Sequence, residues 1–228
     1  GALGANDNGT VHFHENNEPA GSTKDMGGLT TLYTDKAIDF LKSKRDKEKP
    51  FVLYLAHTMM HTIIDASERF RGKSKGGLYG DVVEEFDYET GRLLDVLDEL
   101  KLRDNTLVIY TSDNGPWNQD RYTKRKKGHP VGSIFWGEAG PLRNGKGSPY
   151  EGGYRLPCIV RWPGKVPAKR TSDAIFATID FLPTFANLCG FDVPKDRRID
   201  GIDQTKLLLG KNKSGRKDFY FNKAGYRL

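Results

Sequence analysis

The sequence predicts an α/β protein in which a mainly parallel sheet is flanked by helices. Three observations favour this fold class: an apolar run at residues 51–56, an amphipathic pattern at 83–100 and a second apolar run at 106–111. Short continuous apolar runs are typical of strands that are covered on both faces, as in parallel sheets. Because a strand, a helix and a strand follow one another, the three segments indicate a βαβ unit.

Residues 1–30 are predicted to be loop, because they are rich in Gly, Asn and Thr and show no apolar periodicity. A short amphipathic helix is expected to begin at Thr34 and Asp35, whose side chains suit a helix N-terminus. This helix is expected to end in the basic residues 42–45.

The segment 83–100 carries the strongest helical pattern in the chain. Its stripe recurs at steps of three and four residues and consists of Phe86, Thr90, Leu93, Leu97 and Leu100. Charged residues are expected on the other faces, namely Asp87, Glu89, Arg92, Asp95, Asp98 and Glu99. The stripe predicts that this helix packs against a sheet.

A long glycine-rich segment, residues 113–154, separates these elements from the rest and has the length of a functional or disordered loop. After it we expect a strand at 156–162 and a helix at 179–188 that tolerates Pro183 in its first turns. A short helix at 204–209 and the start of a strand at 218–221 complete the prediction.

The composition is that of a globular chain. Of the 228 residues, 36% are hydrophobic and 11% aromatic, which is enough for a core, and no apolar run is long enough to span a membrane. The two cysteines, Cys158 and Cys189, lie in apolar stretches without the spacing of a metal site. We expect both to be buried, unreactive thiols.

The net charge of +6 includes a dense basic cluster at residues 124–127. A solvated loop is the favoured interpretation, and the alternative is attraction of a polyanion such as nucleic acid or a sulfated or phosphorylated substrate. Nucleic acid binding would call for stacking aromatic residues among the basic ones, and only Tyr122 lies nearby. A non-catalytic polyanion-binding module therefore stays a minor alternative.

Polar residues follow directly on both predicted strands, at the edge where ligands gather in open α/β sheets. Asp113 and Asn114 come after the second strand, and Gly115 and Pro116 allow the bend that would bring both side chains to one point. A carboxylate beside a carboxamide offers hard oxygen donors for Ca²⁺ or Mg²⁺. The alternative is an Asx turn that only caps the loop.

Two histidines, His57 and His61, follow the first strand at a spacing of four. No Glu follows His57 as in a zinc-binding helix, so zinc is discounted. Either histidine suits general acid or base catalysis, because imidazole titrates near neutrality. The alternative for each is a structural histidine that is bonded to the backbone.

The segment GPLRNGKG, residues 140–147, nearly matches a phosphate-binding loop but lacks its hydroxyl residue and its following helix. Lys146 lies between two glycines, which leave its ammonium group unobstructed near an anion. The alternative is an ordinary flexible turn.

Taken in order, these pieces resemble the sulfatase family, and in particular arylsulfatases of the alkaline phosphatase-like superfamily. The matching stretches are PFVLYLAHTMMHT (50–62), LYGDVVEEFDYETGRLLDVLDEL (78–100), DNTLVIYTSDNGPW (104–117), GPLRNGKGSPYEGGYRLPCIVRWPG (140–164) and ATIDFLPTFANLCG (177–190). The resemblance implies that the whole protein hydrolyses sulfate esters with a formylglycine nucleophile and a divalent cation, usually Ca²⁺.

The resemblance also implies roles for individual residues. Asp113 and Asn114 would supply two ligands of the cation, His61 would assist departure of the leaving group, and Lys146 would contact the sulfate oxygens. Supporting positions are His57, Glu151 and Arg155. Charge stabilisation by a cation and an ammonium group, with proton donation to the alkoxide, is chemistry that sulfuryl transfer needs.

The sequence departs from the family pattern in two respects. Met60 and Ile63 stand where the family usually has prolines. No [CS]-x-P-x-R motif for the formylglycine occurs in these residues, so we expect it upstream of residue 1 and expect the isolated chain to be inactive. Residues 1–205 would then be a partial catalytic domain, and residues 206–228 the start of a C-terminal subdomain.

The resemblance leaves the substrate and the compartment open. A phosphodiesterase or phosphonate hydrolase of the same superfamily is the alternative activity, because phosphate and sulfate esters share their tetrahedral shape. The substrate would be a sulfated small molecule or polysaccharide, and residues 118–139 with Tyr122, His129 and Trp136 could shape that choice. Family members are usually exported or lysosomal, although no leader is visible in these residues.

Overall fold

The computed structural model describes residues 10–61, 64–117, 137–211 and 214–220. The chain divides into two compact units. The first consists of Gly1–Leu102 with Asn114–Tyr154, and the second of Arg103–Asp113 with Arg155–Leu228. No helix within the described ranges is both long and apolar enough to cross a membrane.

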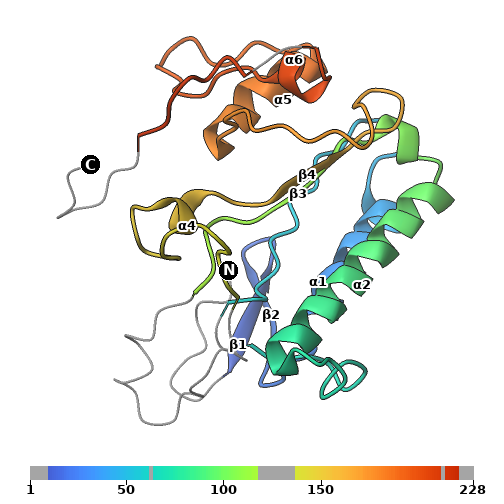
Figure 1. Ribbon diagram of the computed structural model, residues 1–228. Helices are drawn as coiled ribbons and strands as arrows, with labels where there is room; N and C mark the ends of the chain where they lie inside the picture. Colours follow the sequence, from blue (N-terminus) through green and yellow to red (C-terminus); the bar gives the residue numbers. More distant parts are fainter. Residues whose placement is uncertain (1–9, 62–63, 118–136, 212–213, 221–228) are drawn as a thin grey trace. The chain divides into compact units, whose positions relative to one another are not determined.

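Two helices and their connection form the core of the first unit. Helix α1 (Leu29–Asp39) continues into a π-helical turn, η1 (Phe40–Lys44), and lies alongside α2 (Gly77–Glu99) (Figure 1). The buried cluster consists of Leu29, Met59, Ile64, Ala66 and Val82. The predicted helices are thus confirmed, and each begins several residues before the expected position.

The buried face of α2 differs from the predicted stripe. Glu85 and Glu89 are almost fully buried, although Glu89 was expected on an exposed face. The hydroxyl group of Thr31 on α1 lies 3.3 Å from Glu85 and 3.1 Å from Glu89, and the Ser67 N–H donates to Glu85 at 2.9 Å. The prediction for Glu89 is wrong because these partners compensate the burial of a carboxylate that periodicity alone assigns to water.

A β-hairpin occupies part of the segment that was predicted to be loop. Strands β1 (Val11–Glu15) and β2 (Glu18–Thr23) pair antiparallel, joined by Asn16 and Asn17. Both asparagines have positive φ, 51° and 71°. Two positive φ angles are what a tight hairpin turn needs, and Asn accepts them more readily than most residues.

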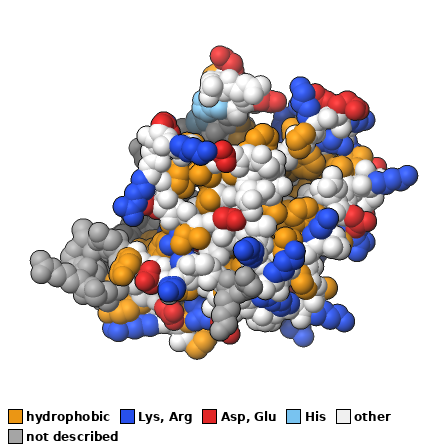
Figure 2. All heavy atoms as spheres, turned by 90° about the horizontal axis from the view of Figure 1, so that it is seen from above, with side chains coloured by type: hydrophobic (Ala, Val, Ile, Leu, Met, Phe, Trp, Pro, Cys, Tyr) orange, Lys and Arg blue, Asp and Glu red, His pale blue; other side chains and the backbone are white. Residues whose placement is uncertain are grey.

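The predicted strand at 51–56 is not formed among the described residues. This segment has no strand assignment, and Val52 and Tyr54 are 84% and 88% exposed. A strand needs a hydrogen-bonded neighbour, and none pairs with this segment in the part of the chain that is described. On the face drawn in Figure 2, hydrophobic side chains lie at the surface among lysines and arginines.

The second unit contains the other strand pair. Strands β3 (Val108–Thr111) and β4 (Cys158–Arg161) confirm the predicted runs in shorter form, after a 3-10 turn, η2 (Arg103–Asn105). They pair antiparallel, with Val108 opposite Arg161 and Thr111 opposite Cys158. Both strand pairs in the described residues are antiparallel, so the expected parallel sheet is not confirmed there.

Three helical elements follow β4 in the second unit: η4 (Thr178–Asp180), α5 (Phe181–Cys189) and α6 (Thr205–Leu208). Pro183 lies in the first turn of α5, as predicted. Residues 218–220 form no strand, and residue 221 lies outside the described residues. Cys158 and Cys189 are exposed, so the prediction of buried thiols is wrong, although local burial raises the pKa of Cys158.

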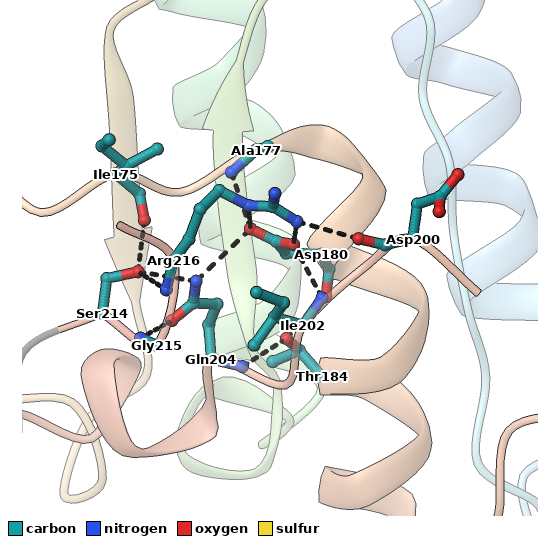
Figure 3. A network of polar contacts seen from close by, with 10 residues as sticks. All are labelled: Ile175, Ala177, Asp180, Thr184, Asp200, Ile202, Gln204, Ser214, Gly215 and Arg216. Atoms are coloured by element: carbon teal, nitrogen blue, oxygen red, sulfur yellow. Dashed lines mark hydrogen bonds and ion pairs between the residues drawn. The ribbon is translucent and has the colours of Figure 1, made fainter. Parts of the chain in front are cut away.

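A polar network ties α5, α6 and the segment around Arg216 together (Figure 3). The Asp180 carboxylate is fully buried and accepts hydrogen bonds from the backbone N–H groups of Ala177 and Ile202, at 2.9 and 2.8 Å. The Arg216 guanidinium group donates to both of its oxygens. Burial by itself would raise the pKa of Asp180, but these hydrogen bonds bring it below its ordinary value.

Candidate active site

The glycine-rich segment around Lys146 is fixed by backbone hydrogen bonds to the residues that follow Asn114. The Lys146 N–H donates to the Pro116 carbonyl at 2.8 Å, and the Gly115 N–H donates to the Gly153 carbonyl at 2.9 Å. Inside the segment, the Gly152 N–H donates to the Arg143 carbonyl at 3.0 Å. Two of the sequence-predicted stretches are therefore brought together.

Three glycines make this close approach sterically feasible. A Cβ atom at Gly115 would lie 1.8 Å from the Gly152 carbonyl oxygen, and one at Gly152 would lie 2.0 Å from the Asn144 carbonyl oxygen. A Cβ atom at Gly153 would lie 2.6 Å from the Ser148 carbonyl oxygen. Since no side chain fits at these distances, only glycine permits this backbone packing.

The side chain of Lys146 is half-buried, and its ammonium nitrogen lies 5.8 Å from the centroid of the Trp117 ring. The neighbouring Ser148 is buried, and its hydroxyl oxygen makes no hydrogen bond within the described part of the chain. The Arg143 guanidinium group covers the Tyr150 ring, with its Cζ atom 3.7 Å from the ring centroid. Ser148 was not predicted from the sequence.

Asp113 and Asn114 lie at a bend that directly follows β3, as expected from Gly115 and Pro116. Asp113 is exposed, with the Ser112 hydroxyl group 3.5 Å from its carboxylate, and belongs to the second unit. Asn114 is half-buried and belongs to the first unit, as do His61 and Lys146.

The donor set suits a hard cation only in part. One carboxylate and one carboxamide are the ligand types that Ca²⁺ prefers, but Ca²⁺ takes six to eight oxygen ligands. The described residues contain no group of three or more His, Cys, Asp or Glu side chains that could hold a metal ion. Two such oxygen donors are fewer than Ca²⁺ takes.

The two histidines have different surroundings. The His57 ring packs edge-on against Phe86, with ring centroids 4.8 Å apart, and its centroid lies 6.1 Å from that of the Tyr33 ring. Burial lowers the pKa of His57 to about 4. Its Nδ1 atom is buried without a hydrogen-bond partner in the described ranges. His61 is exposed, and its backbone N–H donates to the Thr58 carbonyl at 3.0 Å.

The other residues named from the sequence are exposed or outside the described residues. Glu151 begins the short helix α4 (Glu151–Tyr154), and both Glu151 and Arg155 are exposed. The basic cluster at 124–127 lies outside the described residues, as do Tyr122, His129 and Trp136.

Comparison with known proteins places this geometry in a family. The family model described as Sulfatase matches residues 3–191. The chain is 39% identical to steryl-sulfatase of Homo sapiens over 194 residues, which are 85% of this chain and 32% of that protein. It is 37% identical to N-acetylgalactosamine-6-sulfatase of Canis lupus familiaris over 193 residues, which are 85% of this chain and 35% of that protein. It thus spans about a third of their length.

A solved structure supports the same assignment. It comes from work on the metabolism of multiple glycosaminoglycans by Bacteroides thetaiotaomicron, is 35% identical, and covers 90% of this chain and 43% of its own, with a TM-score of 0.70. The expected sulfatase-type α/β fold is confirmed at this level. Because the family model spans most of the sequence, this chain belongs to the sulfatase family.

Proposed function

We propose that the whole protein that contains this chain hydrolyses sulfate esters. The observation that carries the proposal is the 2.8 Å hydrogen bond from the Lys146 backbone N–H to the Pro116 carbonyl, which fixes the segment of a half-buried lysine to the residues that follow Asn114 in a member of the sulfatase family. The two curated relatives are named for different sulfated alcohols, so the proposal covers the ester bond and leaves the alcohol open.

In this proposal Lys146 binds the sulfate oxygens, and His61 donates a proton to the departing alkoxide. The ammonium group of Lys146 stabilises negative charge on the sulfuryl oxygens in the transition state. His61 is favoured over His57 as the acid because it is exposed, whereas the ring of His57 is packed against Phe86.

Asp113 and Asn114 would hold the divalent cation, Ca²⁺ or alternatively Mg²⁺, together with ligands from outside these residues. When bound, the cation supplies positive charge beside the sulfuryl group, and a formylglycine outside this chain supplies the nucleophile. Asp113 and Asn114 would thus position the cation, and the cation would in turn orient the sulfate ester.

We further propose that the whole protein completes a mainly parallel sheet, with residues 206–228 beginning a C-terminal subdomain. The exposed apolar side chains of Val52 and Tyr54 support this completion, because helices cover both faces of a parallel sheet and would bury them. Export of the protein, as the family resemblance implies, is part of the same proposal.

Hydrolysis of p-nitrophenyl sulfate by the whole protein tests the activity. We expect turnover in the presence of Ca²⁺, and we expect Lys146→Ala to lower kcat/KM by about a hundredfold, the loss typical of one charge-stabilising donor. The exposed Lys47, changed to Ala, serves as the control and should leave kcat/KM unchanged. Preferred hydrolysis of the matched aryl phosphate would replace this proposal with the phosphodiesterase alternative.

A further inference from the structure

The second unit contains a groove of about 1100 Å³ that runs along β4. Its lining includes the apolar residues Ile159, Val160 and Phe176, the segment that follows β4, and Leu207 and Leu208 of α6. The Arg170 guanidinium group donates to the Leu207 carbonyl at 3.2 Å, so the segment that follows β4 is bonded to α6. Two parts of the groove lining are therefore connected.

All charged side chains that line the groove are positive. Its five ionisable Lys and Arg residues are Arg103, Arg161, Lys165, Lys169 and Arg170, and no Asp or Glu is among the described residues that line it. Lys165 and Lys169 are exposed, and within the described ranges neither is in an ion pair. A groove whose lining combines several cations with apolar side chains attracts a polyanion.

The groove is distinct from the site proposed for catalysis. Val108 at the start of β3 pairs with Arg161 at the end of β4, whereas Asp113 lies beyond Thr111 at the opposite end of β3. Arg103, Arg161 and Lys165 are at the first of these ends, where the Trp162 indole N–H donates to the Asp104 carbonyl at 3.1 Å. The length of β3, roughly 10 Å, separates them from Asp113.

We propose that this groove binds a sulfated polysaccharide at a second site, away from the ester that is hydrolysed. The choice of this substrate class rests on the proposed function. The sulfate groups would lie against the cations, and the apolar face of a sugar ring against the exposed side chain of Ile159.

Single-stranded nucleic acid fits the groove less well, because it needs aromatic rings that are open for stacking. The two aromatic residues that line the groove have other contacts: the Trp162 indole group is bonded to backbone, and the Phe176 ring packs against Phe181 at 5.1 Å. Charge complementarity therefore favours the carbohydrate.

The test measures binding of the whole protein to chondroitin sulfate, with unsulfated chondroitin as the reference ligand. The variant is Lys165→Gln/Lys169→Asn, in which Asn accepts the positive φ of 56° at residue 169. We expect about tenfold weaker binding and a log-log salt dependence whose slope is shallower by about 1.5, because two cations are removed. The control variant Lys195→Gln/Lys217→Gln removes the same charge from exposed positions outside the groove and should bind as the wild type does.

The outcomes separate this inference from the proposed function. The groove variant should hydrolyse p-nitrophenyl sulfate at the wild-type rate, because it leaves Lys146 and His61 intact. Equal losses of binding in the groove variant and the control, or tighter binding of poly(dT) than of chondroitin sulfate, would overturn the inference. Groove-dependent binding in a protein that hydrolyses no aryl sulfate would refute the proposed function and leave the groove assignment standing.

Discussion

Two histidines four residues apart illustrate how surroundings, rather than residue type, decide what a side chain can do. His57 lies between Tyr33 and Phe86, where burial disfavours the imidazolium form and lowers the pKa to about 4. His61 is exposed to solvent. Near neutral pH, His57 is therefore an uncharged packing residue, and His61 is the histidine that is open to solvent.

The lowered pKa of His57 predicts a pH dependence of stability. Between the folded pKa of about 4 and the ordinary value of 6.5, the unfolded chain binds more protons than the folded one. Stability should therefore be full above pH 6.5 and decline as the pH falls toward 4, by about 1 kcal/mol after discounting for partial exposure. Urea unfolding at a series of pH values measures this.

The variant His57→Phe supplies the comparison. Phenylalanine keeps an aromatic ring beside Phe86 and removes the buried Nδ1 atom that has no partner in the described residues. We expect the decline below pH 6.5 to become shallower and the turnover of aryl sulfate to persist. A loss of turnover with unchanged stability would assign His57 a catalytic role instead.

The glycines around Lys146 give a second prediction at the residue scale. Gly115→Ala would place a Cβ atom 1.8 Å from the Gly152 carbonyl oxygen, so the segment that carries Lys146 must shift. A shift of about 1 Å in a catalytic group costs on the order of a hundredfold in rate, and we expect kcat/KM to fall accordingly. Kinetics with p-nitrophenyl sulfate, alongside a circular dichroism spectrum that verifies folding, measure the effect.

Gly91→Ala is the matched control, because nothing lies within 4 Å of a Cβ atom at this position of α2. Alanine favours helix over glycine by up to about 1 kcal/mol, so this variant should be slightly more stable and fully active. Normal kinetics of Gly115→Ala would contradict the role of close packing in positioning Lys146.

At the scale of elements, sequence patterns predicted those parts of the fold that local periodicity specifies. The stripe in α2 is such a local signal, and the predicted helices α2 and α5 are both present. The hairpin β1–β2 was not predicted, although the apolar residues Val11 and Phe13 alternate with His12 and His14 before the Asn16–Asn17 turn. A high content of glycine and asparagine is typical of loops, but hairpin turns favour the same residues because they need positive φ angles.

Pairing between strands was harder to predict, because it depends on contacts between distant segments. The apolar run at 51–56 has the composition of a central strand but lacks a partner in the described residues. Strands β3 and β4 were both predicted as runs, whereas their antiparallel register is visible only in the structure. For the candidate site, motifs single out Lys146 and Asn114 as candidates, but the glycine contacts that join their segments are visible only in the structure.

The Asp180–Arg216 pair gives a prediction at this scale. Arg216→Met would leave the buried Asp180 carboxylate without its cation, which costs about 3 kcal/mol of the free energy of unfolding. Arg197→Met removes an arginine from an exposed pair with Asp196 and should leave that free energy unchanged. Urea unfolding of the two variants measures the difference, and equal stability would contradict the structural role of the buried pair.

At the scale of the whole molecule, this chain corresponds to about a third of its curated relatives, 32% of one and 35% of another. The family's nucleophile motif does not occur in these 228 residues. Apolar side chains that the proposed complete sheet would cover are exposed in the described residues, notably Val52 and Tyr54. Activity and stability should therefore differ between the isolated chain and the whole protein.

We expect the isolated chain to hydrolyse no aryl sulfate with Ca²⁺ present and to bind the hydrophobic dye ANS through its exposed apolar residues. The double variant Val52→Thr/Tyr54→Thr should reduce dye binding by the isolated chain without lowering its stability, because both side chains are exposed there. The same variant should destabilise the whole protein by about 3 kcal/mol, since burial of such side chains contributes roughly that much. Equal effects of the variant on both proteins would show that this surface stays uncovered, and turnover by the isolated chain would overturn the roles proposed for Asp113, Asn114, His61 and Lys146.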